Sequence, residues 1–142
     1  MKAAEIPDEI YEKITALSEE GNQLAEEELH TAALEKFTKA YELIPEPKFS
    51  WDTTLWTLAA IGDMRFQLKD YSGALDALKE ACKCPGGVEN PFVLLRLGQS
   101  YLEKGDEKSA ADYLIRAYML AGEDIFEGGE SYLEFLKAKA KL

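Results

Sequence analysis

The chain has 142 residues, 46% hydrophobic and 30% charged, which is typical of one globular domain and too apolar for a disordered chain. Acidic residues number 27 and basic residues 16, so the formal net charge is −11. Because binders of nucleic acids and of anionic membranes gain affinity from positive charge, this balance argues against both partners. A basic protein partner is permitted.

Helical periodicity covers almost the whole chain, and no stretch alternates with period two. We therefore predict an all-α fold with seven helices, approximately over residues 7–25, 31–43, 52–68, 70–82, 90–104, 106–120 and 132–140. Pro45 and Gly105 end helices, and Asn90 followed by Pro91 is a paired start signal. Asp52 and Ser131 are predicted N-caps.

Four columns of residues recur when the helices are aligned. They are Gly21, Gly62 and Gly98; Ala33, Ala74 and Ala110; Phe37, Leu78 and Leu114; and Ala40, Ala81 and Ala117. Small residues let helices approach closely, and the larger residue is expected to fill the gap between hairpins. The extra residues between copies fall at 46–52 and 85–90, between hairpins, where insertions are tolerated.

These columns resemble the tetratricopeptide repeat (TPR), a helix hairpin of about 34 residues. The third copy matches best, through Leu94, Leu97-Gly98, Tyr101 and Gly105-Asp106, whereas Arg65 departs from the apolar residue usual at its position. The resemblance implies one domain over 1–142, an α-α superhelix (solenoid) of three TPR-like hairpins with a C-terminal capping helix. The implied segments are hairpins at about 14–47, 55–88 and 91–124 and a capping helix at about 131–141.

In this family the first helix of each hairpin lines a concave groove. The groove positions carried over to this sequence give the candidate partner-binding residues Asn22, Trp56, Asp63, Phe66, Phe92, Leu95, Arg96 and Gln99. The repeat does not require large aromatic residues such as Trp56, Phe66 and Phe92 at these positions. Because buried aromatics and arginines dominate binding energy at interfaces, they are the expected contacts with a partner.

The sequence allows two other interpretations of the groove residues. The inserted loops, with Phe49, Trp51 and Val88, could fold back and bury the groove aromatics as core. A clamp for chaperone C-terminal carboxylates would use five family positions, of which only Asn22 and Arg96 match. Because the lysines that would hold a carboxylate are missing, binding of chaperone tails is not expected.

Acidic residues concentrate in the first third of the chain, where residues 1–50 hold 12 acids against 5 bases. Glu19, Glu26, Glu27 and Glu28 place this charge around the first hairpin. The cluster is interpreted either as a solvated helix face or as an acidic patch that steers a basic partner toward the protein.

The sequence holds little that could perform catalysis. It has one histidine, His30, and no nucleophile, phosphate-binding or dinucleotide-binding motif. Cys82 and Cys84 lack the spacing of a zinc or redox site, and two free thiols suit a reducing compartment. The first residues do not resemble a signal peptide. We expect a cytoplasmic non-enzyme with no cofactor and no metal.

The segment RAYMLAGEDIFEG…YLEFL resembles the tail of small stand-alone bacterial TPR proteins encoded beside polymorphic toxins, which are regarded as immunity proteins. This resemblance implies a protein that binds a cognate toxin and neutralises it, and the acidic charge would suit a basic toxin domain. Two alternatives stay open. One is a TPR-type secretion chaperone that holds a client segment in its groove, and the other is a structural adaptor or homo-oligomer.

Overall fold

The computed structural model describes residues 6–141, and these residues form helices with no strand among them. The α-helices are α1 (Asp8–Glu26), α2 (His30–Leu43), α3 (Asp52–Gln67), α4 (Tyr71–Ala81), α5 (Pro91–Glu103), α6 (Glu107–Ala121) and α7 (Glu130–Lys139). Three short 3₁₀-helices, η1 (Lys48–Ser50), η2 (Gly87–Glu89) and η3 (Glu123–Phe126), lie in the connections. The all-α prediction is confirmed over this range, and each predicted helix begins and ends within two residues of the observed one.

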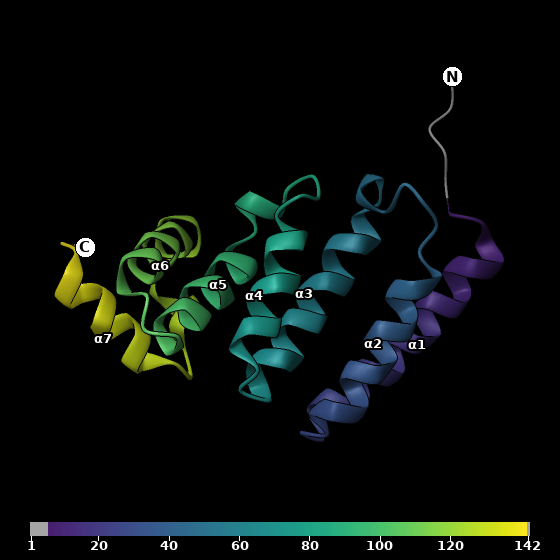
Figure 1. Ribbon diagram of the computed structural model, residues 1–142, viewed down its shortest axis with the longest axis horizontal. Helices are drawn as coiled ribbons and strands as arrows, with labels where there is room; N and C mark the ends of the chain where they lie inside the picture. The colour runs from purple at the N-terminus through teal and green to yellow at the C-terminus, as the bar shows by residue number, and fades with distance from the viewer. Residues whose placement is uncertain (1–5, 142) are drawn as a thin grey trace.

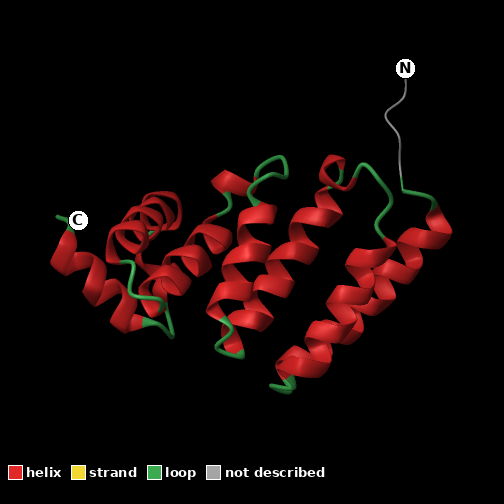
Figure 2. Cartoon of the chain, viewed as in Figure 1, coloured by secondary structure: helices red, strands yellow, loops and turns green. Residues whose placement is uncertain are grey.

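Consecutive helices pair into three hairpins, α1–α2, α3–α4 and α5–α6. Neighbouring hairpins contact each other through α2 with α3 and through α4 with α5, and α3 also meets α5 directly. Figure 1 shows the hairpins in a row, with α7 beside the last one. Figure 2 shows that the connections between helices are short and lie at the ends of the hairpins. No helix within residues 6–141 is long and apolar enough to cross a lipid bilayer.

Polar side chains cap the starts of α4, α5 and α6. The Asp70 and Asp106 carboxylates accept hydrogen bonds from the Gly73 and Ser109 amides at 3.0 and 3.1 Å, at the starts of α4 and α6. The Asn90 side chain accepts from the Val93 amide at 3.1 Å and begins α5. Each cap satisfies an amide that has no partner within the helix, which fixes where that helix begins.

Two predicted caps are wrong. Asp52 is the first residue of α3, after Trp51, and makes no capping bond, although its charge suits the positive end of the helix. Ser131 is the second residue of α7, which begins one residue earlier. The Glu130 carboxylate accepts a hydrogen bond from the Gly128 amide at 3.2 Å and so ties the turn to the start of α7.

The repeated glycines lie where the two helices of each hairpin cross. A Cβ atom at Gly62 would stand 2.6 Å from Leu78 Cγ, and one at Gly98 would stand 2.6 Å from Leu114 Cγ. Gly21 faces the Phe37 ring in the same way. The large residue of each copy therefore packs first on the glycine of its own hairpin, a contact that the sequence interpretation placed between hairpins.

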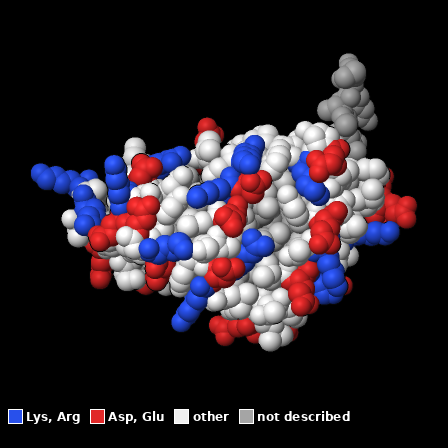
Figure 3. Space-filling view, in the orientation of Figure 1, with Lys and Arg blue, Asp and Glu red and all other residues white. Residues whose placement is uncertain are grey.

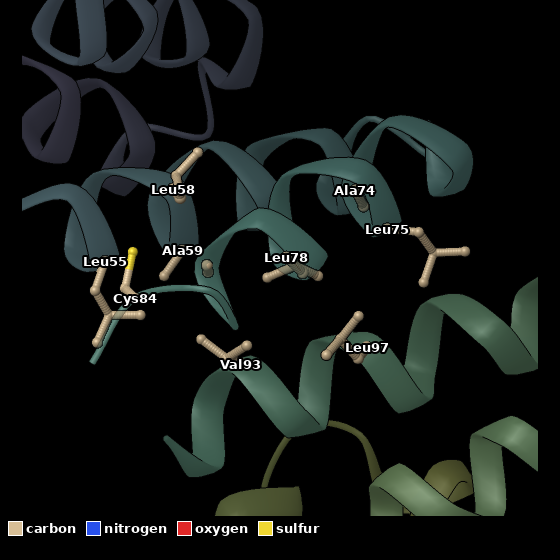
Figure 4. Close-up of a cluster of buried hydrophobic side chains, with 10 residues drawn as sticks. Leu55, Leu58, Ala59, Ala74, Leu75, Leu78, Cys84, Val93 and Leu97 are labelled. Carbon is tan, nitrogen blue, oxygen red and sulfur yellow. The ribbon is translucent and has the colours of Figure 1, made fainter. Parts of the chain in front are cut away.

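The same large residues also join neighbouring hairpins. Leu78 of α4 shares a buried cluster with Val93 and Leu97 of α5, as Figure 4 shows. The six alanines of the repeat columns are completely buried, so the helices meet at short distance without voids. At the far end, Phe126 of η3 and Leu136 of α7 cover the apolar face left by α5 and α6.

Candidate functional site

Two adjoining pockets open along the first helices of the hairpins. The first has a volume of about 540 Å³, lies between α1 and α3, and reaches Phe92 at the start of α5. The second has a volume of about 480 Å³ and lies between α3, α5 and the segment from η3 to α7. Phe92 borders both pockets and separates them. Together they form one surface, the groove, defined by the residues of the two pockets.

Most of the predicted groove residues lie in these two pockets. Asn22, Trp56 and Phe92 line the first pocket. The second pocket is lined by Phe66, Phe92, Leu95, Arg96 and Gln99. Asp63 lies behind the second pocket, where it binds Arg96. Leu95 and Gln99 are 4% and 3% exposed, so they form walls and offer a partner very little surface.

Trp56 is the most exposed aromatic side chain of the groove. It is 65% exposed, on a helix whose neighbouring residues Thr57, Leu58 and Ala59 are buried. The small side chains of Ala59 and Ala60 line the pocket beside it and leave the space open. Among residues 6–141, the charged residue that lines this first pocket is Glu19. The pocket thus presents one indole, an apolar floor and a single negative charge.

Arg96 organises the second pocket. Its Nε donates to Asp63 Oδ1 at 2.9 Å, and its Nη1 donates to Gln99 Oε1 at 2.6 Å. The guanidinium also lies between two rings, 4.7 Å from the centre of Phe66 and 5.1 Å from that of Phe92. Asp63 offsets the positive charge of Arg96, and the two rings fix the orientation of the guanidinium plane. Arg96 therefore mainly positions the side chains around it.

The start of α7 closes one end of the second pocket, a contribution that the sequence interpretation missed. Gly128, Gly129 and Tyr132 line this end. The Tyr132 hydroxyl donates to Glu103 Oε1 at 2.7 Å, and burial together with this bond raises the Tyr132 pKa far above its ordinary value. The hydroxyl therefore stays protonated. Gly128-Gly129 was visible in the sequence as a helix break, but nothing there indicated that the break borders the groove.

The inserted loops do not cover the groove. Phe49 packs on the core between α3 and α4, and Trp51 packs beside Ile14, where its Nε1 donates to the Pro45 carbonyl at 2.8 Å. Val88 is 50% exposed. None of the three loop residues lines either pocket. The alternative in which these loops bury the groove aromatics is therefore wrong for Trp56, which stays open to solvent.

The four predicted acidic patch residues fall in two places. Glu19 lines the first pocket, whereas Glu26 ends α1 and Glu27 and Glu28 form the turn into α2. All four are exposed, and within residues 6–141 no ion pair involves them. Seven residues of helix, about 10 Å, separate Glu19 from Glu26. Figure 3 shows acidic and basic side chains interspersed on the face that it displays.

The two cysteines form no disulfide, and their thiols resist deprotonation. Cys84 is buried and Cys82 half-buried, and burial raises the pKa of both thiols. The described part of the chain holds no group of three or more His, Cys, Asp or Glu side chains placed to bind a metal ion.

Comparison with protein-family models and with curated protein sequences gave no match to this chain.

Proposed function

We propose that this chain is a non-catalytic protein-binding module of the TPR type, a superhelical solenoid that holds part of another protein in its groove. The observation that carries the proposal is Trp56, an indole left 65% exposed beside an open apolar pocket. Burying one large apolar side chain contributes about 1.5–3 kcal/mol, and that gain is unused in the isolated protein. A partner that covers Trp56 would recover it.

The repeat contacts support the TPR assignment. All three hairpins place a glycine of the first helix against a large residue of the second, in the order glycine, alanine, large residue, alanine. The first helices α1, α3 and α5 border the groove, which is the arrangement that the family resemblance implies. The short segment η3 and helix α7 act as the terminal cap that such arrays need.

The partner that we propose is a bacterial toxin domain, which this protein would bind and neutralise in the cytoplasm. Two observations support it: the tail resembles small TPR proteins encoded beside toxins, and the net charge is −11. The first pocket agrees with a basic partner, because Glu19 is the charged residue that lines it among residues 6–141 and is exposed. Opposite charge on the toxin domain would speed association.

The test takes its toxin domain from the gene next to this one in the source genome, and the absence of a toxin gene there would count against the proposal. Binding is measured by calorimetry with the wild type, with Trp56→Ala, and with Met119→Ala as the matched control. Met119 is 77% exposed on α6 and lines neither pocket. We expect Trp56→Ala to weaken binding by about 2 kcal/mol or more, as for a hot spot, with an unchanged melting temperature. Met119→Ala should bind like the wild type.

Trp56→Ala is a sharper test than Phe92→Ala. Removing the Phe92 ring would also release Arg96, so lost binding could reflect a disturbed second pocket. Equal affinity of Trp56→Ala and wild type would overturn the proposal that a partner covers Trp56. If the toxin domain does not bind at all, while a secreted client protein binds through Trp56, the chaperone alternative is correct and the toxin proposal is wrong.

A further inference from the structure

The turn between α1 and α2 departs from the other two hairpin turns. Leu29 occupies the N-cap position of α2, where the other hairpins have Asp70 and Asp106. Both aspartates accept a capping hydrogen bond, and Leu29 makes none. Replacing such a cap with an apolar residue costs about 0.5–2 kcal/mol. The first hairpin therefore carries a leucine where stability favours an aspartate.

This leucine contributes to an exposed apolar surface. Leu29 is 51% exposed, and Leu68, from the turn of the next hairpin, is 40% exposed. Both line one shallow pocket of about 450 Å³, together with Thr31 and Ala32 of α2. Two leucines from neighbouring turns thus meet at the surface of the protein, where they add little to its stability.

Two acidic residues line this pocket, which His30 also borders, and two more acids precede it in the chain. Glu26 ends α1, Glu27 follows it, and Glu28 and Glu35 line the pocket itself. The carboxyl end of a helix carries partial negative charge, so acids at the end of α1 are placed where they destabilise the helix. Within residues 6–141 no ion pair involves any of these four. In Figure 3, acidic side chains lie next to uncharged surface at the lower end of this hairpin.

We propose that this tip surface, formed by Glu26, Glu27, Glu28, Leu29, Glu35 and Leu68, is a second docking site. It binds a basic protein segment in which an apolar side chain is flanked by Lys or Arg. The apolar side chain enters between Leu29 and Leu68, and the cations pair with the glutamates. The missing cap and the acids at a negative helix end cost stability, the exposed leucines add little to it, and such a basic apolar segment would use all three features.

Charge selects this occupant over others. A second copy of the chain, an anionic membrane or a nucleic acid would bring negative charge against four glutamates. The tip surface shares no residue with the two pockets of the groove, so the inference goes beyond the proposed function and does not depend on it.

The experiment measures fluorescence anisotropy of a labelled helical peptide made of Leu and Lys, with the Leu and Glu version as a charge control. Leu29→Asp should weaken binding of the Lys peptide about tenfold, the effect of losing one buried interface side chain. This variant adds negative charge and restores the cap, so it should be at least as stable as the wild type. The matched control is Leu43→Asp, the same change at an exposed leucine at the other end of α2.

The outcomes separate the explanations. A large loss in Leu29→Asp with little loss in Leu43→Asp supports the tip surface, as do peptide-induced amide shifts at residues 26–35 and 68. Equal or tighter binding by Leu29→Asp would mean that charge alone attracts the peptide, which overturns the proposal. A loss confined to Trp56→Ala would move the site to the groove. A concentration-dependent dimer that Leu29→Asp abolishes would show that a second copy occupies the tip.

Discussion

Gly62→Ala should lower the stability of this protein, although the same change stabilises most helices. In an open helix, alanine is favoured over glycine by about 1 kcal/mol. Here the new Cβ would lie 2.6 Å from Leu78 Cγ and 2.7 Å from Leu78 Cδ2, whereas ordinary contacts are 3.4–4 Å. Leu78 is completely buried among other core side chains, so it can make room only by displacing them.

The size of the effect follows from these two opposing terms. Overpacking a core typically costs about 1–3 kcal/mol, and the shift needed here places Gly62→Ala near the upper limit. After the gain in helix propensity, the net loss is about 2 kcal/mol. For a chain of this length, that loss lowers the melting temperature by about 6 °C, which circular dichroism measures directly.

A double-mutant cycle supplies the control. Leu78→Ala alone should destabilise the protein by about 3 kcal/mol, because it leaves a cavity at a fully enclosed position. In that background Gly62→Ala has room for its methyl group and should stabilise by about 1 kcal/mol. Urea unfolding of the four variants gives the coupling energy. A neutral or stabilising Gly62→Ala in the wild-type background would refute the close helix crossing.

Two further predictions concern turns and caps. Lys69 has a positive φ of 64° at the turn position where the third hairpin has Gly105. Because glycine adopts this conformation without strain, Lys69→Gly should stabilise the protein by about 1 kcal/mol, and Gly105→Lys should destabilise it by a similar amount. Thermal melts of the two variants measure both changes. The hydrogen bond from the Ser109 amide lowers the Asp106 pKa below 3.8, the ordinary pKa of an aspartate. The cap therefore stabilises the fold above pH 3.8, and this contribution is lost as the pH falls through the pKa of Asp106 in the folded state. Asp106→Asn should therefore lose less stability than the wild type between pH 6 and pH 3 in urea melts; an equal loss would contradict the assignment.

The repeat register was predictable because it depends on residue size at fixed spacing. A glycine, two alanines and one large residue per copy are sufficient to indicate a close helix crossing. The partner of the large residue was not predicted correctly, because Leu78 packs on Gly62 of its own hairpin as well as against the next hairpin. Helix starts were predictable where a polar residue caps them, as at Asn90. The predicted start at Ser131 was wrong, because the Glu130 carboxylate closes the turn at Gly128 and α7 begins at Glu130.

The state of the groove residues was less predictable, because it depends on contacts between distant residues. Arg96 and Asp63 are 33 positions apart, and no local pattern indicates that they bind each other. The same holds for Phe66 and Phe92, whose rings enclose the guanidinium. Sequence position identified Arg96 as a groove residue, but only the fold reveals that its charge is already offset.

Residues that lower stability at the hairpin turns are distributed unevenly among the three hairpins. The turn of the third hairpin combines Gly105 with the cap Asp106, and both residues favour stability. The first hairpin has Glu28 at positive φ, followed by Leu29 in place of a cap. Both hairpins are built on the same columns of glycine, alanine and a large residue, so the fold does not require these changes. Glu28 and Leu29 thus cost stability without serving the fold, which is consistent with the tip surface that we propose as a docking site.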